Sequence, residues 1–262
     1  MTKLSVFTFN FEGRDWKFRI REGTFDIGII QEVAYDPFYA ISRFLIGEKD
    51  VVIDVGAHIG AFSIFAAARG AKVIALEPVQ ENFELLEENL RLNHLQDVIK
   101  PIKAALWTMD SLREIRKPHP DEANTGAGGF FYSDPRALVE TVECITLQTL
   151  FEKENIQRRS LLKMDCEGAE FEILHAFSGS ILGKIDAIVL EYHLRQDADF
   201  QKLLNILYLG NFLVDWEQRA PYLGMLIGVR ESILDAEIFR PWSLSWAMSP
   251  VVVDSRISRV PI

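Results

Sequence analysis

The sequence predicts an α/β protein in which a seven-stranded, mostly parallel sheet carries helices on both faces. Three apolar runs rich in β-branched residues, at 51–55, 72–76 and 161–164, are typical of strands buried on both sides. Each run is followed by polar residues and then by a helical pattern, as expected for parallel strands joined by crossover helices. A final pair of apolar runs, at 212–216 and 223–229, suits a sheet with one antiparallel strand.

An N-terminal extension precedes this sheet. Residues 4–20 alternate apolar and polar side chains on either side of a turn at 12–15, which predicts a β-hairpin. Residues 35–46 carry an apolar stripe and predict a helix, with Asp36 as its cap and Pro37 at its first position.

The segment 51–77 combines a strand, a glycine turn, a helix over 60–69 and a second strand. Asp54, Gly56 and Gly60 lie where the first strand passes into the helix, and glycine lets the backbone come close to a ligand. Glu77 ends the second strand, where a carboxylate can accept hydrogen bonds from both hydroxyls of a ribose. The segment therefore predicts an adenosine-containing cofactor across the strand ends.

The glycine pattern restricts which cofactor this is. Gly56 and Glu77 are 21 residues apart, close to the spacing in NAD-binding folds. However, the pattern is Asp-x-Gly-x-x-x-Gly, and Asp54 would bring a negative charge to a pyrophosphate. S-adenosylmethionine fits better because it carries a sulfonium and an α-amino group. A strand-helix-strand unit without a ligand would explain the apolar strands but not the polar residues at both strand tips.

The middle of the chain continues the sheet and then interrupts it. Residues 81–93 predict an amphipathic helix, 98–106 a strand broken by Pro101, and 139–145 a strand followed by a helix from 147. Residues 117–136 lack periodicity and are rich in glycine and proline. A loop of this length is either a substrate lid or an insertion without fixed structure.

Two later strands also end in polar residues. Asp165 and Glu167 follow the strand at 161–164, and the strand at 185–190 is followed by Glu191 and His193. Because the carboxyl ends of parallel strands meet at one edge, we expect these side chains to face the same cleft as Gly56 and Glu77.

The amino-acid composition restricts the kinds of partner that this protein is expected to bind. A formal charge of −10 weighs against nucleic acid, whose binding draws on Lys and Arg. No apolar run approaches the roughly 20 residues of a membrane span, and the N-terminus lacks the features of a signal peptide. We therefore expect a cytoplasmic protein that does not bind membranes. The two cysteines, Cys144 and Cys166, give no basis for a disulfide framework.

Two motifs make the sequence resemble the FkbM family of S-adenosylmethionine-dependent methyltransferases: residues 54–60 together with Glu77-Pro78, and residues 162–170, Leu-Lys-Met-Asp-Cys-Glu-Gly-Ala-Glu. The resemblance covers about residues 30–193 and implies the Rossmann-like class I methyltransferase fold. It also implies O-methylation of a hydroxyl on a small molecule, a sugar or a secondary metabolite. We expect the cofactor to be bound by Asp54, Gly56, His58, Gly60 and Glu77, although relatives often carry Asn at position 58.

These expectations divide the chain into three parts. Residues 1–46 are predicted to form a substrate-side extension, 47–230 the S-adenosylmethionine-binding methyltransferase domain, and 231–262 a C-terminal tail. The tail carries Trp242, Trp246 and a Val run at 251–253, and we expect it to form either the contact of a homo-oligomer or a strap across the sheet.

A hydroxyl acceptor must lose a proton during methyl transfer. We predict His193 as the general base, because histidine normally titrates near neutral pH, and Asp165 as the residue that orients the acceptor or the base. In an alternative mechanism, Asp165, Glu191 and His193 hold Mg²⁺ or another divalent ion that lowers the pKa of the hydroxyl. Two other functions stay open, a non-catalytic protein that binds S-adenosylmethionine and, less favoured, an NAD-dependent oxidoreductase.

Overall fold

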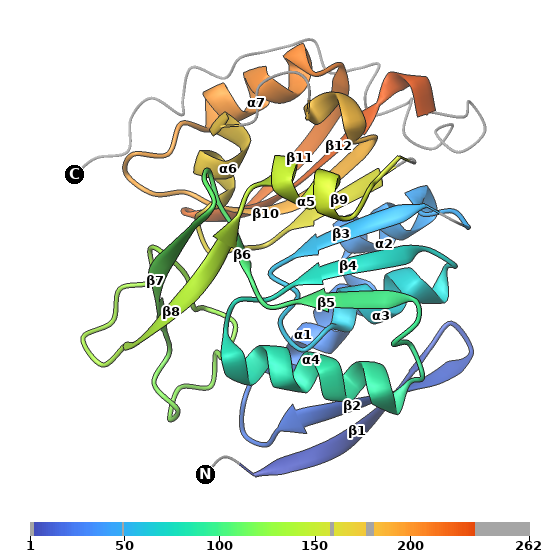
Figure 1. The fold of residues 1–262 in the computed structure, drawn as a ribbon, viewed down its shortest axis with the longest axis vertical. Helices are drawn as coiled ribbons and strands as arrows, with labels where there is room; N and C mark the ends of the chain where they lie inside the picture. Colours follow the sequence, from blue (N-terminus) through green and yellow to red (C-terminus); the bar gives the residue numbers. More distant parts are fainter. Residues whose placement is uncertain (1–2, 49, 158–159, 177–180, 234–262) are drawn as a thin grey trace.

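The central sheet contains seven strands in the order β11-β12-β10-β9-β3-β4-β5 (Figure 1). The computed structural model describes residues 3–48, 50–157, 160–176 and 181–233. Neighbouring strands of this sheet are parallel, except that β12 runs antiparallel to both β10 and β11. The topology confirms the predicted class I methyltransferase fold.

The strands of this sheet follow the predicted apolar runs. They are β3 (Val51–Val55), β4 (Lys72–Leu76), β5 (Ile99–Ile102), β9 (Ser160–Met164), β10 (Ala187–His193), β11 (Phe212–Ala220) and β12 (Leu223–Arg230). In the parallel register Asp54 of β3 lies beside Ala75 of β4 and Lys163 of β9. The three strands therefore end at the same level, and the residues that follow them meet at one edge.

Helices cover both faces of the sheet. One face carries α1 (Asp26–Tyr35), α2 (Pro37–Leu45), α3 (Ala61–Ala68) and α4 (Gln80–Leu92). The other face carries α5 (Leu147–Lys153), α6 (Glu170–Ala176) and α7 (Phe200–Leu209). Short 3-10 helices lie at Leu182–Lys184 and Glu231–Ile233.

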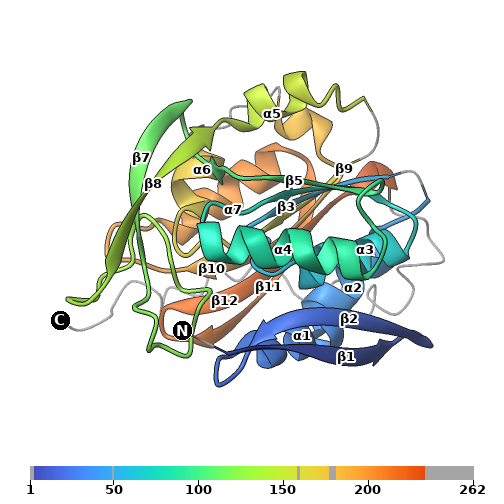
Figure 2. The same cartoon turned by 60° about the horizontal axis from the view of Figure 1, so that its bottom comes forward.

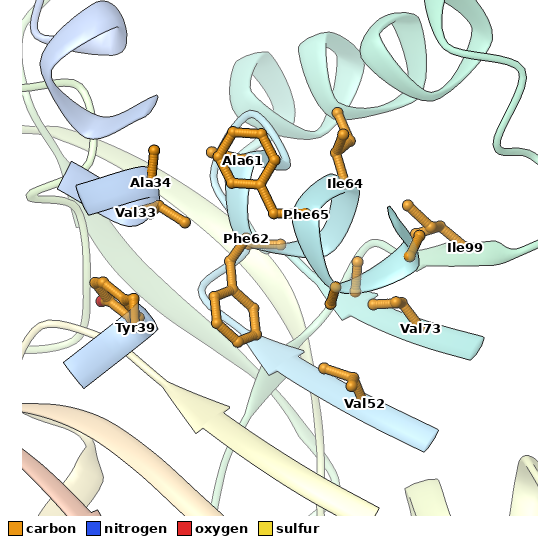
Figure 3. Packing of buried hydrophobic residues seen from close by; sticks show 14 of the residues in the cluster. Val33, Ala34, Tyr39, Val52, Ala61, Phe62, Ile64, Phe65, Val73 and Ile99 are labelled. Carbon is orange, nitrogen blue, oxygen red and sulfur yellow. The ribbon is translucent and has the colours of Figure 1, made fainter. Parts of the chain in front are cut away.

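Two apolar cores flank the sheet because successive strand residues point to opposite faces. Val52 belongs to one core and Ile53 to the other, and both are fully buried. Figure 3 shows the first core, in which Val52 and Val73 of the sheet lie beneath Phe62 and Phe65 of α3. Each such side chain contributes about 1.5–3 kcal/mol through burial, which holds the strand ends in place.

The N-terminal extension forms the predicted hairpin from β1 (Leu4–Phe11) and β2 (Arg14–Arg21). The hairpin packs outside α3 and α4 as a further layer (Figure 2). The predicted helix over 35–46 begins at Pro37, and the Asp36 carboxylate accepts hydrogen bonds from the backbone N–H groups of Phe38 and Tyr39. Helix α1 was not predicted, because Gly28 interrupts a weak apolar stripe.

A second, three-stranded sheet contains β6 (Ala105–Leu106), β8 (Leu138–Ile145) and β7 (Ser111–Lys117). The strand predicted over 98–106 is therefore two strands. The chain turns between them, where the Ala104 N–H donates to the Ile102 carbonyl at 2.9 Å. After this turn β6 pairs with β8 instead of continuing along β4. Strand β7 has mostly exposed residues and was not predicted.

Some predictions lie outside the described residues. The oligomer contact assigned to the tail falls on residues 234–262, and the boundaries of the three predicted parts stay predictions. Within the described ranges, the helices are too short or too polar to cross a membrane.

Candidate functional site

A cavity of about 390 Å³ lies where β3, β4, β9 and β10 end. Its volume is within the range of roughly 300–1,000 Å³ that ligand pockets occupy. Helices α1 to α4, strands β6 and β7 and the loop between β7 and β8 also contribute lining residues. The cavity therefore lies at the carboxyl edge of the sheet, beside the point where the strand order reverses at β3.

The glycine turn after β3 forms one wall of this cavity. Gly56 adopts a φ of +73°, and a Cβ atom at this position would lie 1.8 Å from the carbonyl oxygen of Asp165. No side chain fits there, so the turn requires glycine. Gly60, at the start of α3, has a φ of +92° and packs against Leu86 of α4. It does not line the cavity.

Asp54 also lies outside the cavity wall. Its carboxylate is fully buried, accepts a hydrogen bond from the Ser63 hydroxyl at 2.7 Å and lies 3.2 Å from the ammonium group of Lys163. The structure therefore places Asp54 beneath the glycine turn, where it contacts protein groups.

Glu77 follows β4 and lines the cavity. Its carboxylate accepts hydrogen bonds from the backbone N–H groups of His58 at 2.8 Å and Val79 at 2.9 Å. The side-chain amide of Asn82 lies 3.5 Å away. Burial raises the pKa of Glu77 to about 7. A carboxylate offers about four acceptor positions, so the two oxygens keep capacity for a ligand.

His58 belongs to a buried polar network that sequence analysis missed. Its Nε2 lies 2.9 Å from Nη2 of Arg21 and 3.0 Å from the hydroxyl of Thr125. Arg21 also donates to Asp26 and Asn82. Burial lowers the pKa of His58 to about 3, so the ring is neutral and accepts at Nε2 from the guanidinium, which can only donate. Arg21 and Asp26 come from β2 and α1, and no motif marks them.

The loop over 117–136 lines the cavity, and its role as a substrate lid stays a prediction. Thr125 donates to Asp26 at 3.0 Å, and the Ala123 carbonyl accepts from the Phe25 N–H. Further along the loop, Gly129 pairs with Arg116 of β7 through two backbone hydrogen bonds. The cavity-lining loop residues are Asn124, Gly126, Gly128, Gly129 and Phe130.

Three carboxylates form the wall at the ends of β9 and β10: Asp165, Glu167 and Glu191. Burial, followed by the charge of Asp165, raises the pKa of Glu191 to about 8. Burial likewise raises the pKa of Glu167 to about 7. The structure thus brings the predicted Asp165 and Glu191 to the cavity that Gly56, His58 and Glu77 line.

His193 lies behind this wall. Its Nε2 is 3.5 Å from Glu167 and 3.6 Å from Glu191, and its Nδ1 is 3.4 Å from Glu170. Burial by itself would lower the pKa of His193, but Glu170 and the other carboxylates raise it to about 10. The imidazole is therefore protonated at neutral pH.

A candidate metal-binding group differs from the predicted one in one residue. The ligand atoms of Asp165, Glu167 and His193 lie within 4.8 Å of one another. Glu167 thus takes the place predicted for Glu191. Carboxylates suit hard divalent ions, but His193 would have to lose its proton to bind one.

Comparisons with known proteins identify the domain family. The family model described as "Methyltransferase FkbM domain" matches residues 54–219. The antimetabolite synthetase AmbE of Pseudomonas aeruginosa is 26% identical over 64% of the chain, which spans 10% of that protein. The hexuronic acid methyltransferase AglP of Haloferax volcanii is 29% identical over 60% of the chain and is covered to 62%. Shorter matches include RNA methyltransferases.

Among solved structures, the FkbM methyltransferase of Methylobacillus flagellatus aligns with 69% of this chain and 43% of its own, at 16% identity and a TM-score of 0.46. The chain spans less than two thirds of the length of AmbE and AglP. The family match covers more than half of the chain and includes the glycine turn and the ends of β4, β9 and β10. The chain therefore belongs to the FkbM methyltransferase domain family.

Proposed function

We propose that this protein transfers the methyl group of S-adenosylmethionine to a hydroxyl group of a small molecule. The observation that carries the proposal is one cavity whose two ends, at β3 and β4 and at β9 and β10 in the order of the sheet, carry chemically different residues. Glu77 and the glycine turn line one end, and the carboxylates of β9 and β10 line the other. The first end suits an adenosine, and the second suits an acceptor that must lose a proton.

The residues at the first end fit this cofactor. Gly56 leaves its turn free of side chains, so the backbone can approach a ligand closely. Glu77 is held by two backbone N–H groups and points a buried carboxylate at the cavity, where it can accept from ribose hydroxyls. When bound, S-adenosylmethionine supplies an electrophilic methyl group on sulfur.

At the second end, we assign the role of general base to Glu191. The pKa of about 10 argues against the predicted base, His193, because a protonated imidazole cannot accept another proton. Glu191 lines the cavity, and its pKa of about 8 is close to the working pH that general acid-base catalysis favours. Asp165 keeps its proposed role of orienting the acceptor, and His193 holds Glu191 and Glu167 in place.

The charge of the cavity supports a small acceptor over nucleic acid. The nearby cations are already engaged, since Lys163 contacts Asp54 and His193 lies among carboxylates. The acceptor end is bordered by the carboxyl groups of Glu32, Asp165, Glu167 and Glu191, which offer a phosphate backbone no counter-charge.

Isothermal titration with S-adenosylmethionine and S-adenosylhomocysteine tests the cofactor assignment, and we expect micromolar dissociation constants. Glu77→Ala should weaken binding by about 1.5–3 kcal/mol, roughly 10- to 150-fold, because the ribose loses its acceptor. Glu84→Ala, at an exposed position of α4, is the matched control. Unchanged binding by Glu77→Ala would refute this position for the ribose.

Radiolabelled S-adenosylmethionine then tests the acceptor class. We expect methyl transfer to hydroxylated small molecules, such as neutral sugars, and none to RNA. Cofactor binding without turnover on any acceptor would favour the non-catalytic alternative, and binding of NAD instead would favour an oxidoreductase. Full activity in excess EDTA would exclude the divalent-ion mechanism.

A further inference from the structure

We infer that Lys163 is a positioning residue that fastens the glycine turn to the acceptor-side carboxylate Asp165. The inference rests on the proposed function and adds a residue to it. Lys163 lies on β9, and only 4% of its side chain is exposed. Lysine is almost never buried to this degree unless its charge is paired.

The ammonium group of Lys163 lies between the ends of two strands. It donates a hydrogen bond to the carbonyl of Gly56 at 2.8 Å and lies 3.4 Å from the carbonyl of Val55. Asp54 provides the counter-charge at 3.2 Å, and Asp165 lies 3.8 Å away on the other side. One cation thus contacts both the cofactor-side turn and the acceptor-side carboxylate.

The two turns also touch directly. The Asp165 N–H donates to the Val55 carbonyl at 3.1 Å, and the space where Gly56 would carry a Cβ is filled by the Asp165 carbonyl. These backbone contacts do not involve the carboxylate of Asp165. Among the described residues, Lys163 is the charged group that lies within ion-pair distance of that carboxylate.

The glycine turn has support besides Lys163, since the N–H groups of Gly56 and Ala57 both donate to the Leu76 carbonyl at 3.0 Å. Loss of Lys163 should therefore affect the Asp165 side chain more than the cofactor site. In-line methyl transfer is sensitive to this placement, because a shift of about 1 Å can cost roughly 100-fold in rate.

Lys163→Met leaves the Asp54 carboxylate buried without its partner, which endangers the fold. The informative variant is therefore the double variant Lys163→Met/Asp54→Asn, which removes both charges and keeps a polar partner for Ser63. Lys100→Met, which removes an exposed lysine paired with Glu154, is the control.

We expect the folded double variant to bind S-adenosylhomocysteine within about threefold of the unchanged protein, while kcat falls roughly 100-fold. Lys163→Arg with intact Asp54 should keep part of the rate. An unchanged kcat, or a loss of rate that only follows a loss of cofactor binding, would overturn the inference.

A crystal structure of the ligand-free double variant provides a second readout that needs no turnover. We expect the Asp165 carboxylate to leave its position, and an unmoved carboxylate would overturn the inference. If the protein without substitutions binds no S-adenosylhomocysteine, the proposed function is refuted. The crystal structure of the double variant would still decide the role of Lys163.

Discussion

The two ends of the cavity, which we propose hold the cofactor and the acceptor, differ in how their carboxylates are held. At the cofactor end, Glu77 accepts two backbone hydrogen bonds, and Asp54 beneath it is paired with Lys163 and Ser63. At the acceptor end, Asp165, Glu167 and Glu191 accept no hydrogen bond from any residue that the structure describes. These three carboxylates have only cations at 3.5–3.8 Å.

The cofactor end is the preorganised one. Fixed backbone donors orient Glu77 before any ligand arrives, so the cofactor end should bind without rearrangement. Burial raises the pKa of Glu167 and Glu191, so these two carboxyl groups favour protonation or a ligand that supplies protons. The acceptor end is therefore suited to take a proton from an incoming hydroxyl.

The largest effect should come from Gly56→Ala, which breaks the cofactor end. The new Cβ would lie 1.8 Å from the Asp165 carbonyl in a turn with positive φ, so the two turns must separate. We expect loss of detectable S-adenosylhomocysteine binding by calorimetry and a stability loss of at least about 3 kcal/mol in a denaturation curve.

Gly13→Ala separates the clash from the backbone strain. Gly13 has a similar φ of +78° in the hairpin turn, but no atom lies within 4 Å of the position that a Cβ would occupy. This control should cost only about 1 kcal/mol and keep cofactor binding. Equal loss of binding in both variants would show that the close approach of the two turns is not what matters.

Glu191→Gln should have the next largest effect, on the acceptor end alone. A neutral amide of similar shape cannot accept the proton, so we expect kcat to fall by about 10²–10⁴-fold. The dissociation constant of S-adenosylhomocysteine should stay within about twofold, because Glu77 and the glycine turn are untouched. Steady-state kinetics and calorimetry measure the two quantities.

Glu217→Gln, on the exposed part of β11, is the control for charge removal and should leave both quantities unchanged. A normal kcat in Glu191→Gln would remove Glu191 as the base. In that case, loss of rate in Asp165→Asn would move the role to Asp165.

Thr125→Val should have a smaller effect, on the lid. The hydroxyl donates a hydrogen bond to Asp26, which ties the loop to α1, and one such bond contributes about 0.5–1.5 kcal/mol. We expect cofactor dissociation to become up to about tenfold faster in stopped-flow measurements, since Asn124 and Gly126 line the cavity. Thr141→Val on exposed β8 is the control, and an unchanged dissociation rate would mean that this contact does not hold the lid.

The residues of the proposed cofactor end could be grouped from the sequence because they are local. The strand, the turn with Gly56 and the carboxylate Glu77 lie within one strand-helix-strand unit, and the fold class follows from repeats of that unit. Even so, the role predicted for Asp54 could not be checked from the sequence, because the contact with Lys163 joins two strands about a hundred residues apart.

The acceptor end could be predicted only as a list of residues. Strand tips showed that Asp165, Glu191 and His193 lie at one edge, but the pKa of His193 depends on Glu170, which a turn with positive φ at Glu167 brings beneath it. The Arg21 network could not be predicted from the sequence either, because its partners come from separate parts of the chain.

The smallest predicted effect is a pH dependence of stability that arises from the acceptor end. The folded-state pKa of Glu191, about 8, is above its unfolded value because of burial and the charges of Asp165, Glu32 and Glu167, which His193 only partly offsets. The folded state therefore holds more protons than the unfolded state, and stability falls as pH rises toward 8. Glu77 and Glu167, with pKa values of about 7, act in the same direction.

His58 and His193 determine the pH range in which this fall in stability is best measured. The pKa of His58, about 3, makes stability rise with pH up to about 6.5 and opposes the carboxyls there. The raised pKa of His193 contributes stability that is complete below about 6.5 and is lost as pH rises through 10, so it adds to the fall. We therefore expect the melting temperature of the ligand-free protein to fall between pH 6.5 and 8.5.

Glu191→Gln removes the contribution of one carboxyl group to this pH dependence of stability, because the amide does not titrate. Removing a contribution on the order of 1 kcal/mol should make the fall in melting temperature about 2–4 °C smaller than in the unchanged protein. Glu217→Gln should leave the fall as it is. Identical pH profiles for the unchanged protein and Glu191→Gln would show that Glu191 is already ionised in the folded state. The acceptor end would then be solvated rather than poised for proton transfer, and its contrast with the cofactor end would disappear.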